Sequence, residues 1–374
     1  MNESIRSQFP ALKRYAYLNS AAVSPIPVSA IEAVNSQLWD VAEHGSTHYP
    51  DWVATKNRAR SLVAGMMKVE PEQVAFTRNT SDGFASVASA IDWEPTDNIV
   101  TFHREFPANF YAWRSVRDRY GVDLRLCPER DGRIDLDEFI GMIDERTRLV
   151  SISAVQFASG FRADLERIGA AAREAGALFS VDIIQGLGAM EFDLPACDVD
   201  IASGASHKWL SAPEGCGILF VSDRAREMLT PSLVGWISVE EPWDFNDLDQ
   251  EYKPNALAWE SGTGASSLFY GLEQSLKLIT ETGISRIEDH LADLSEVLCE
   301  GLRERGYSIV SSRLPGESSQ IVSVRPPDGR SAEEVFRQLE SEHIIVSARS
   351  GIIRISPHFF NVRGDIDRLL ENLP

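Results

Sequence analysis

A lysine in apolar surroundings offers the first chemistry in this sequence. Lys208 lies in the run 205–210, between two apolar stretches at 179–183 and 217–221 that are typical of strands. Because the lysine ammonium is strongly hydrated, such a position indicates a chemical use, and a lysine there can form a Schiff base with an aldehyde cofactor. Asp182 supplies the carboxylate that pyridoxal phosphate needs beside its ring nitrogen. The pair favours an enzyme that uses this cofactor.

A polar segment between a predicted strand and a predicted helix has the form of a phosphate-binding turn. Residues 76–83 read FTRNTSDG, and Thr80 and Ser81 offer hydroxyl groups there. Hydroxyls and free backbone N–H groups at a helix N-terminus stabilise a dianion. The same residue types are also ordinary helix caps, so the segment taken alone favours a plain cap. The phosphate interpretation depends on its occurrence together with Lys208.

The elements that must position these residues follow an alternating pattern from about residue 60. Strands are predicted at 73–77, 98–102, 123–127, 149–154 and 178–182, and helices at 58–67, 82–91, 108–120, 135–143 and 165–175. Strands that alternate with helices indicate an α/β fold with a mainly parallel sheet covered on both faces. Ligands of such folds bind at the carboxyl ends of the strands, where Asp182 ends one strand and Lys208 follows another.

The pattern changes after residue 265, and a smaller α+β domain is expected there. Two long amphipathic helices are predicted first, at 268–280 and 284–305. They are followed by strands at 321–324, 344–348 and 352–356, a helix at 332–341 and a closing helix from Gly364. We therefore expect a large domain over 15–265 and a small domain over 266–374 together with residues 1–14. The acidic stretch 239–251 is expected to be a solvated loop, with a lid as the alternative.

Composition excludes several classes of protein. The 374 residues carry a formal net charge of −20, which argues against nucleic-acid and anionic-membrane partners. The four cysteines form no CxxC pair, so neither a zinc framework nor a dense disulfide scaffold is expected, and no metal is predicted. The start lacks an apolar run of signal-peptide length, and no run reaches the length of a membrane span. A cytoplasmic location is the expectation.

Seven short motifs occur in the order of one known family. They are YLNSAA at 17–22, NTSDG at 79–83, EFPAN at 105–109, DIIQ at 182–185, HKWLSAPEG at 207–215, ESGT at 260–263 and RISPHFFN at 354–361. Together they resemble the class V aminotransferase and cysteine desulfurase family, a branch of the fold-type I pyridoxal-phosphate enzymes. The resemblance implies a large domain with a mainly parallel, seven-stranded sheet and a smaller α+β C-terminal domain.

The resemblance also assigns roles around the cofactor ring. Lys208 is expected to form the Schiff base and then to act as general acid and base at Cα. Asp182 is expected to pair with the pyridinium nitrogen, and Gln185 to hydrogen-bond the phenolic oxygen of the ring. Phe106 is expected to stack on the ring, with packing in the core as the alternative.

Further positions of the resemblance concern the phosphate and the substrate. Thr80, Ser81, Ser206 and His207 are expected to hold the phosphate, although Ala205 stands where the family often has serine. Thr263 resembles the residue that reaches the phosphate from the neighbouring subunit, which implies a homodimer with shared active sites.

Arginines near the C-terminus suit the substrate carboxylate. Arg354 matches the family arginine that binds the α-carboxylate, a task for which bidentate guanidinium geometry is suited. Arg349 is a second candidate for that role, and a structural ion pair is the favoured interpretation for it.

Departures from the family pattern limit the reaction. No cysteine lies between Gly306 and Arg354, where persulfide-forming desulfurases carry their nucleophile, so that mechanism is disfavoured. Phe157 stands where desulfurases tend to have asparagine, so the substrate pocket differs there. Trp236, Trp243 and Trp259 are expected either to line an aromatic entrance or to pack in a core or interface.

The resulting expectation is an aminotransferase-type enzyme that acts on a small or aromatic amino acid. Two alternatives stay open. One is a C–S lyase, selenocysteine lyase or amino-acid epimerase of the same family, since one cofactor supports all of these reactions. The other is a non-catalytic relative that binds pyridoxal phosphate for structure or regulation.

Overall fold

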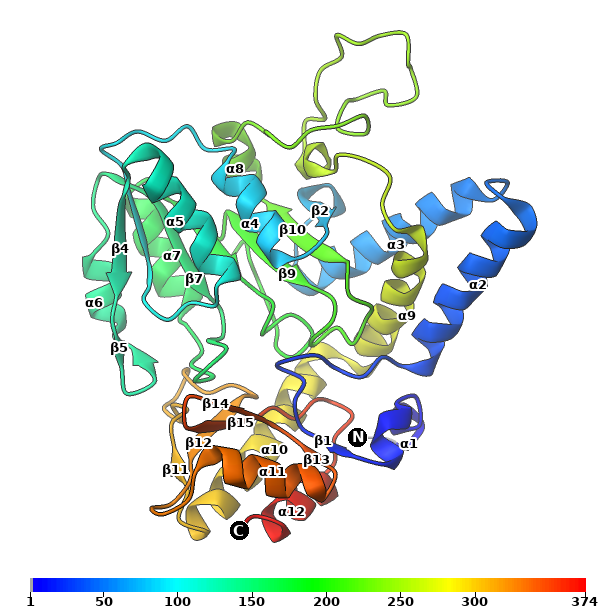
Figure 1. Ribbon diagram of the computed structural model, residues 1–374. Helices are drawn as coiled ribbons and strands as arrows, with labels where there is room; N and C mark the ends of the chain where they lie inside the picture. Colours follow the sequence, from blue (N-terminus) through cyan, green and yellow to red (C-terminus); the bar gives the residue numbers. More distant parts are fainter. Residues whose placement is uncertain (1–2) are drawn as a thin grey trace.

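A seven-stranded sheet forms the centre of the molecule, for which the computed structural model describes residues 3–374 (Figure 1). In spatial order its strands are β2 (Val74–Thr77), β10 (Gly217–Val221), β9 (Ile201–Ala205), β8 (Leu178–Asp182), β7 (Thr147–Ser153), β3 (Asn98–Phe102) and β4 (Asp123–Cys127). Strand β10 runs antiparallel to both of its neighbours, and the other six strands run in one direction. The predicted α/β fold with a mainly parallel sheet is confirmed.

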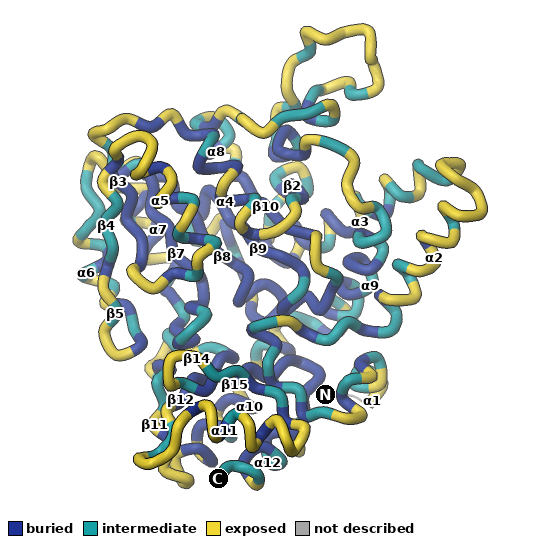
Figure 2. Tube along the Cα trace, viewed as in Figure 1, coloured by how far each residue is buried: buried dark blue, intermediate teal, exposed yellow. Residues whose placement is uncertain are grey.

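Helices cover both faces of this sheet, which explains why its central strands are buried. The helices are α2 (Val28–His44), α3 (Tyr49–Met67), α4 (Thr80–Ala88), α5 (Ala108–Tyr120), α6 (Leu136–Gly141), α7 (Leu165–Glu174), α8 (Asp223–Met228) and α9 (Ser266–Thr282). Neighbouring strand residues enter different clusters: Leu178 packs in the cluster that contains Trp113, and Phe179 in the cluster that contains Ile168. Every residue of β8, β9 and β10 is buried (Figure 2). Both faces of the sheet are therefore core.

The C-terminal part builds a second, antiparallel sheet. Its strands are β11 (Ser308–Ile309), β12 (Val322–Arg325), β15 (Ile352–Ile355) and β14 (Ser347–Arg349), in that spatial order, and its helices are α10 (Ile284–Glu304), α11 (Ala332–Ser341) and α12 (Arg363–Glu371). The single strand predicted at 344–348 is wrong. Residues Ile344 and Ile345 form β13, which pairs in parallel with β1 (Ala16–Tyr17), whereas β14 pairs with β15. The predicted strand is split at Val346 because its first part pairs with β1 and its second part pairs with β15.

The N-terminal segment contacts the C-terminal part of the chain. Besides the β1–β13 pair, Arg6 forms a 2.8 Å ion pair with Asp365. Helices α2 and α3 form a hairpin that packs on α9. The sequence predicts only the second half of α3, from residue 58. Asp40 stabilises its tip by accepting hydrogen bonds from His48 at 2.6 Å and from Trp52 at 3.1 Å. The predicted domain limits stay predictions.

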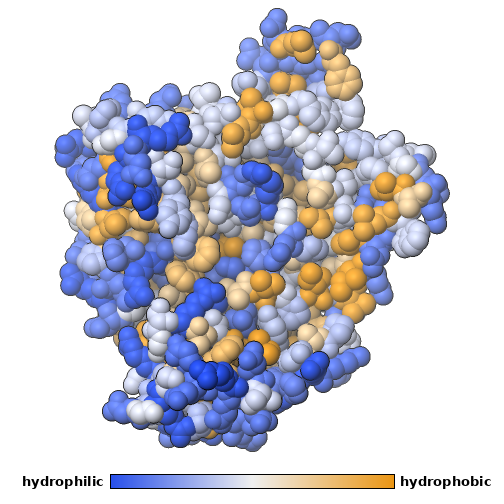
Figure 3. Space-filling view, viewed as in Figure 1, coloured by the Kyte–Doolittle hydropathy of each residue, from blue (hydrophilic) through white to orange (hydrophobic). Residues whose placement is uncertain are grey.

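The acidic stretch 239–251 projects away from the sheet as an exposed loop, at the top of Figure 1. A bridge between Val239 and Tyr252 closes its base, and the side-chain amide of Gln250 donates to three carbonyl groups of the loop. Apolar patches lie on the loop among its charged residues (Figure 3), and Trp243 and Phe245 are exposed there. Of the described helices, none is long and apolar enough to cross a membrane.

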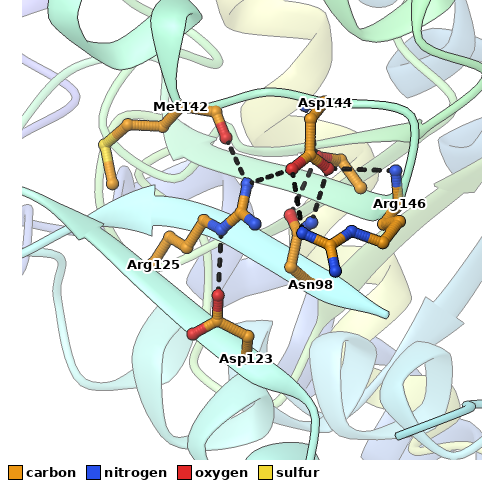
Figure 4. A network of polar contacts seen from close by, with 7 residues as sticks. Asn98, Asp123, Arg125, Met142, Asp144 and Arg146 are labelled. Atoms are coloured by element: carbon orange, nitrogen blue, oxygen red, sulfur yellow. Dashed lines mark hydrogen bonds and ion pairs between the residues drawn. The ribbon is translucent and has the colours of Figure 1, made fainter. Parts of the chain in front are cut away.

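A polar network holds the amino-terminal edge of the large sheet, where β3, β4 and β7 begin (Figure 4). Asp144 accepts hydrogen bonds from the Asn98 amide at 2.8 Å and from Arg125 at 2.9 Å. Arg125 also donates to Asp123 and to the carbonyl of Met142. Partial desolvation opposes ionisation, but these donors lower the pKa of Asp144 far below its usual range. The network therefore fixes the alignment of three strands at the edge opposite to Asp182.

One buried carboxylate joins three parts of the fold. Glu260 forms ion pairs with Lys56 at 2.5 Å and with Arg60 at 2.7 Å, and it accepts a hydrogen bond from the Phe76 N–H at 2.8 Å. Burial raises the pKa of Glu260, but the two cations outweigh this effect and lower the pKa to about 2. Removing one partner of such a pair leaves the opposite charges buried without compensation.

We predict that Glu260→Gln lowers the free energy of unfolding by about 3–5 kcal/mol at neutral pH. Because the pKa is depressed in the folded state, the contribution of Glu260 is present above pH 4.5 and is lost as the pH falls toward 2. Urea unfolding at several pH values measures both effects. Asp193→Asn, which breaks an exposed pair with Lys68, is the control and should cost far less. Equal losses in both variants would contradict the prediction.

Candidate functional site

A cavity of about 350 Å³ lies at the carboxyl edge of the large sheet. It is lined by residues from the N-terminal segment, the β2–α4 turn, the start of α5, the end of β8, the segment after β9 and the β14–β15 hairpin. The lining residues used below are Thr80, Ser81, Phe106, Phe157, Asp182, Gln185, His207, Lys208, Arg349 and Arg354. The structure therefore brings together most of the residues that the sequence singled out.

Lys208 lies in this cavity on the connection between β9 and β10. Its side chain is 6% exposed, and its Nζ lies 5.2 Å from the centre of the Phe106 ring. Burial lowers the pKa of the Lys208 ammonium; Asp182 counteracts this, and the cations of Arg354 and Arg349 add to it. A lysine with a lowered pKa has a larger neutral fraction, which is the form that attacks a carbonyl or accepts a proton.

Asp182 ends β8 with one carboxylate oxygen in use and one free. Its Oδ1 accepts a 2.9 Å hydrogen bond from the Ile184 N–H, and its Oδ2 is buried with no partner among the described residues. Burial raises the pKa of Asp182, and the nearby Glu105 carboxyl adds to the effect. An unsatisfied buried carboxylate oxygen is costly, and a cationic N–H group would remove that cost.

The β2–α4 turn places a second unsatisfied group in the cavity. Asn79 caps α4 by accepting a hydrogen bond from the Asp82 N–H at 2.9 Å, and Thr80 is the first residue of the helix. The hydroxyl of Thr80 is buried and has no partner among the described residues. This hydroxyl lies beside the helix N-terminus, where an anion is stabilised. His207, half-buried with a pKa lowered by burial and by Lys208, lines the same cavity.

Two glycines allow this turn to approach the strands. A Cβ atom at Gly83 would lie 2.3 Å from the Ser203 hydroxyl of β9, and one at Gly217 would lie 2.5 Å from the backbone nitrogen of Asn79. A larger residue would displace the Ser203 side chain at the first position and the backbone of the turn at the second. The close packing of α4 on β9 and β10 therefore depends on glycine at both positions.

Aromatic and amide side chains form the walls of the cavity. The rings of Phe106 and Phe157 meet edge to face, with their centres 5.2 Å apart. The Gln185 side chain is fixed at both ends, since its Nε2 donates to the Ala21 carbonyl at 3.0 Å and its Oε1 accepts from Trp209 at 2.9 Å. These contacts fix the orientation of the amide in the cavity wall.

Sequence reasoning missed Glu105 as a residue of the site. It is buried beside Phe106, accepts hydrogen bonds from the Ser153 N–H at 2.8 Å and the Gln156 amide at 2.7 Å, and burial raises its pKa. The available signal was an acidic residue within the EFPAN motif at 105–109. Its effect on Asp182 is electrostatic, because it adds a second carboxyl group to the same buried region.

Some predicted residues do not line this cavity. Ser206 is fully buried, and its hydroxyl donates to the Pro213 carbonyl. Thr263 lies in a separate pocket with Trp236 and Trp243, and Trp259 is buried in a core cluster. No aromatic entrance therefore surrounds Lys208 within the described part of one chain, and the expected phosphate contacts of Ser206 and Thr263 stay predictions.

The residues present fit pyridoxal phosphate. An unpartnered carboxylate oxygen on Asp182 suits its pyridinium N–H, and an unpartnered hydroxyl on Thr80 at a helix N-terminus suits its phosphate. Phe106 offers a flat aromatic face beside Lys208. Among the described residues, the one cluster of possible metal ligands is Asp40, His44 and His48 on the α2–α3 hairpin, outside the cavity.

Comparisons with known proteins find relatives over almost the whole chain. A model of the aminotransferase class-V family matches residues 16–369. A probable cysteine desulfurase from Methanothermobacter thermautotrophicus is 27% identical, with 99% of this chain and 97% of the relative covered. The uncharacterized aminotransferase YcbU from Bacillus subtilis is 25% identical, with the same coverage of both chains.

Solved structures show the same fold. The apo structure of a cysteine desulfurase from Thermococcus onnurineus superposes with a TM-score of 0.90 at 25% identity and covers 99% of this chain and 97% of its own. The cystine C–S lyase C-DES, in complex with its product cysteine persulfide, has a TM-score of 0.89 at 22% identity, with 98% of this chain and all of the other covered.

We predict that Lys208→Ala abolishes covalent attachment of pyridoxal phosphate and the visible absorbance that arises from it. Absorbance spectra and mass spectrometry after borohydride reduction measure this directly. Lys13→Ala, at an exposed position, is the control and should keep both signals. A Lys208→Ala protein that retains the covalent label would assign the attachment to another lysine.

We predict opposite effects of Thr80→Val on the apoprotein and on cofactor binding. The variant removes a buried hydroxyl without a partner, so the apoprotein should be equally stable or more stable. Its affinity for pyridoxal phosphate should fall about tenfold, because a charge-assisted hydrogen bond to the phosphate is lost. Thermal unfolding and fluorescence titration with the cofactor separate the two effects. Unchanged cofactor affinity would exclude Thr80 from the phosphate site.

Proposed function

The chain belongs to the aminotransferase class-V family of pyridoxal-phosphate-dependent enzymes, and from this premise we propose that it transfers the amino group of an amino acid. The observation that carries the proposal is the presence of a buried lysine, a buried aspartate and a buried arginine in one cavity. Lys208, Asp182 and Arg354 are each less than 10% exposed there. A base, a partner for the cofactor ring and an anchor for a carboxylate are the groups that chemistry at an amino-acid Cα needs.

The cofactor would be held by residues on several sides of the cavity. Asp182 and Gln185 would bind its ring, Phe106 would stack on the ring, and Thr80, Ser81 and His207 would bind its phosphate. When bound, pyridoxal phosphate supplies an acceptor for the electron pair that remains when a bond to Cα breaks.

The side chains of this protein would then position the substrate and move its proton. The Nζ of Lys208 would accept the proton from the substrate Cα and return it, for which its lowered pKa is suited. Arg354 would bind the α-carboxylate; its Nη1 donates to the Phe157 carbonyl at 2.9 Å, and its buried Nε has no partner within residues 3–374. Phe106 and Phe157 would keep water away from the reacting carbon.

A C–S lyase is the second candidate, supported by relatives that are named cysteine desulfurases. If this protein cleaves a C–S bond, we propose that it does so without a thiol of its own. None of its four cysteines, Cys127, Cys197, Cys216 and Cys299, lines the cavity, and three of them are buried. Burial also raises the pKa of each thiol, which disfavours the nucleophilic thiolate.

We also propose a homodimer in which Thr263 completes the active site of the partner. Thr263 lies in a pocket apart from Lys208, together with the exposed Trp236 and Trp243. Helix α2 adds the exposed apolar side chains of Ile31, Leu38 and Trp39, and a surface of this kind is typical of a protein interface. Sedimentation at several concentrations tests the assembly.

Mass spectrometry of the cofactor after a single turnover tests the proposed reaction. The holoenzyme is incubated with a panel of amino acids and no keto acid. Pyridoxamine phosphate together with the matching keto acid would establish transamination and identify the donor. Unchanged pyridoxal phosphate with a cleaved or inverted amino acid would overturn the proposal in favour of a lyase or an epimerase.

We predict that Arg354→Ala keeps the cofactor bound but weakens the spectral response to amino acids by about 10- to 100-fold, because one charged hydrogen-bonded pair is lost. Arg354→Lys should recover only part of the response, since lysine lacks the bidentate geometry. Absorbance titration of each holoenzyme measures the effect. Arg325→Ala, on the exposed end of the neighbouring strand β12, is the control. Loss of the cofactor from Arg354→Ala would give Arg354 a different role.

A further inference from the structure

The β14–β15 hairpin presents two arginines on one face. Arg349 is paired with Ile352 and Ser347 with Arg354 in the antiparallel register. Because paired residues share a face and alternate residues along a strand point the same way, all four side chains lie on the same side of the hairpin. Arg349 and Arg354 are thus diagonal neighbours, a position from which long side chains reach each other.

A two-residue turn fixes this register. Ser350 and Gly351 both have positive φ angles, of 51° and 73°. Such a turn matches the twist of the strands that it joins, and it leaves no freedom for the pairing to shift by one residue. The juxtaposition of the two guanidinium groups is therefore built into the fold.

Neither arginine is neutralised by the protein. Within residues 3–374, no carboxylate forms an ion pair with Arg349 or Arg354, although Arg104 nearby is paired with Glu129 at 3.0 Å. The interpretation of Arg349 as a structural ion-pair residue thus finds no partner in the described chain. Burial and the Arg349 cation lower the pKa of Arg354 to about 10, as expected for like charges in proximity. Arg349 lies exposed at the end of β14, where water can hydrate it, whereas Arg354 is buried, and an anion bound beside both would reduce their mutual repulsion.

A second cavity of about 240 Å³ adjoins the one that contains Lys208. The two share Phe157, Arg349 and Arg354 in their walls. Ala158 and Ile352 add apolar surface to the second cavity, and Arg104 and Ser347 add polar groups. An apolar wall with a cationic end suits a short methylene chain that ends in an acid group.

We infer that the substrate is an amino acid with a second acid group at the end of a short side chain, and that Arg349 binds this group. The inference rests on the proposed function, because it takes the α-carboxylate to be bound by Arg354. The side chain would extend along Phe157 into the adjoining cavity, where the second acid group neutralises Arg349. An acidic substrate, rather than an aromatic one, would satisfy both unpaired arginines at once.

Binding of simple acids to the holoenzyme tests the subsite without turnover. Glutarate, with two carboxylates, is compared with butyrate, with one, by calorimetry. We expect glutarate to bind at least tenfold more tightly, as a second charged hydrogen-bonded pair requires. In Arg349→Gln this preference should fall to about twofold or less, and Arg349→Lys should retain part of it. Arg325→Gln removes a charge from the same sheet and should keep the preference of the unmodified protein.

The possible results distinguish a failure of the inference about Arg349 from a failure of the proposed reaction. Equal weakening of both acids in Arg349→Gln would overturn the inference, because Arg349 would then bind the carboxylate that they share. An unchanged preference in Arg349→Gln would overturn it as well. The single-turnover panel should show faster conversion with aspartate or glutamate than with alanine, and equal rates would contradict the inference while leaving the proposed function intact. A preference that depends on Arg349, with no conversion of any amino acid, would reject the proposed function and keep the subsite.

Discussion

The structure depends on two side chains of opposite charge that are held away from water at one edge of the large sheet. Lys208 and Asp182 are both buried there, and burial disfavours the charged form of each. Two buried polar atoms of the site, one carboxylate oxygen of Asp182 and the hydroxyl of Thr80, have no hydrogen-bond partner in the described part of the chain. Such a site is stable only because the strands that carry it are buried on both faces and cannot adjust.

The fold supplies this rigidity from elements distant in sequence. Strand β8 places Asp182, the connection after β9 places Lys208, and the hairpin of the smaller sheet adds Arg354. Gly83 and Gly217 allow α4 and the turn before it to pack closely on β9 and β10, and Thr80 at the start of this helix lines the same cavity. The unsatisfied groups of the site are thus a property of the whole packing rather than of one motif.

The sequence predicted three strands of the large sheet to the residue, at 98–102, 123–127 and 178–182. The first and third are mainly apolar, and the second, at the sheet edge, alternates polar with apolar residues. The local pattern gave no bounds for β9, the expected strand before Lys208, which contains Ser203 and Gly204 and packs between β8 and β10. The split at Val346 depends on a partner strand more than 300 residues earlier. Glu105 and the unpaired state of Arg349 depend on contacts across the fold, so neither could be read from local pattern.

The polar network around Asp144 lies at the opposite edge of the sheet, where β3, β4 and β7 begin. Its donors and acceptors bind one another, whereas Asp182, Thr80 and Arg354 in the Lys208 cavity each have a buried polar atom with no partner among the described residues. One edge therefore contributes to stability and the other to ligand binding, so residues at the two edges can be substituted independently. An engineer who seeks greater heat tolerance should redesign the Asp144 edge, and one who seeks a new specificity should redesign the other, with little expected interference between the two sets of substitutions.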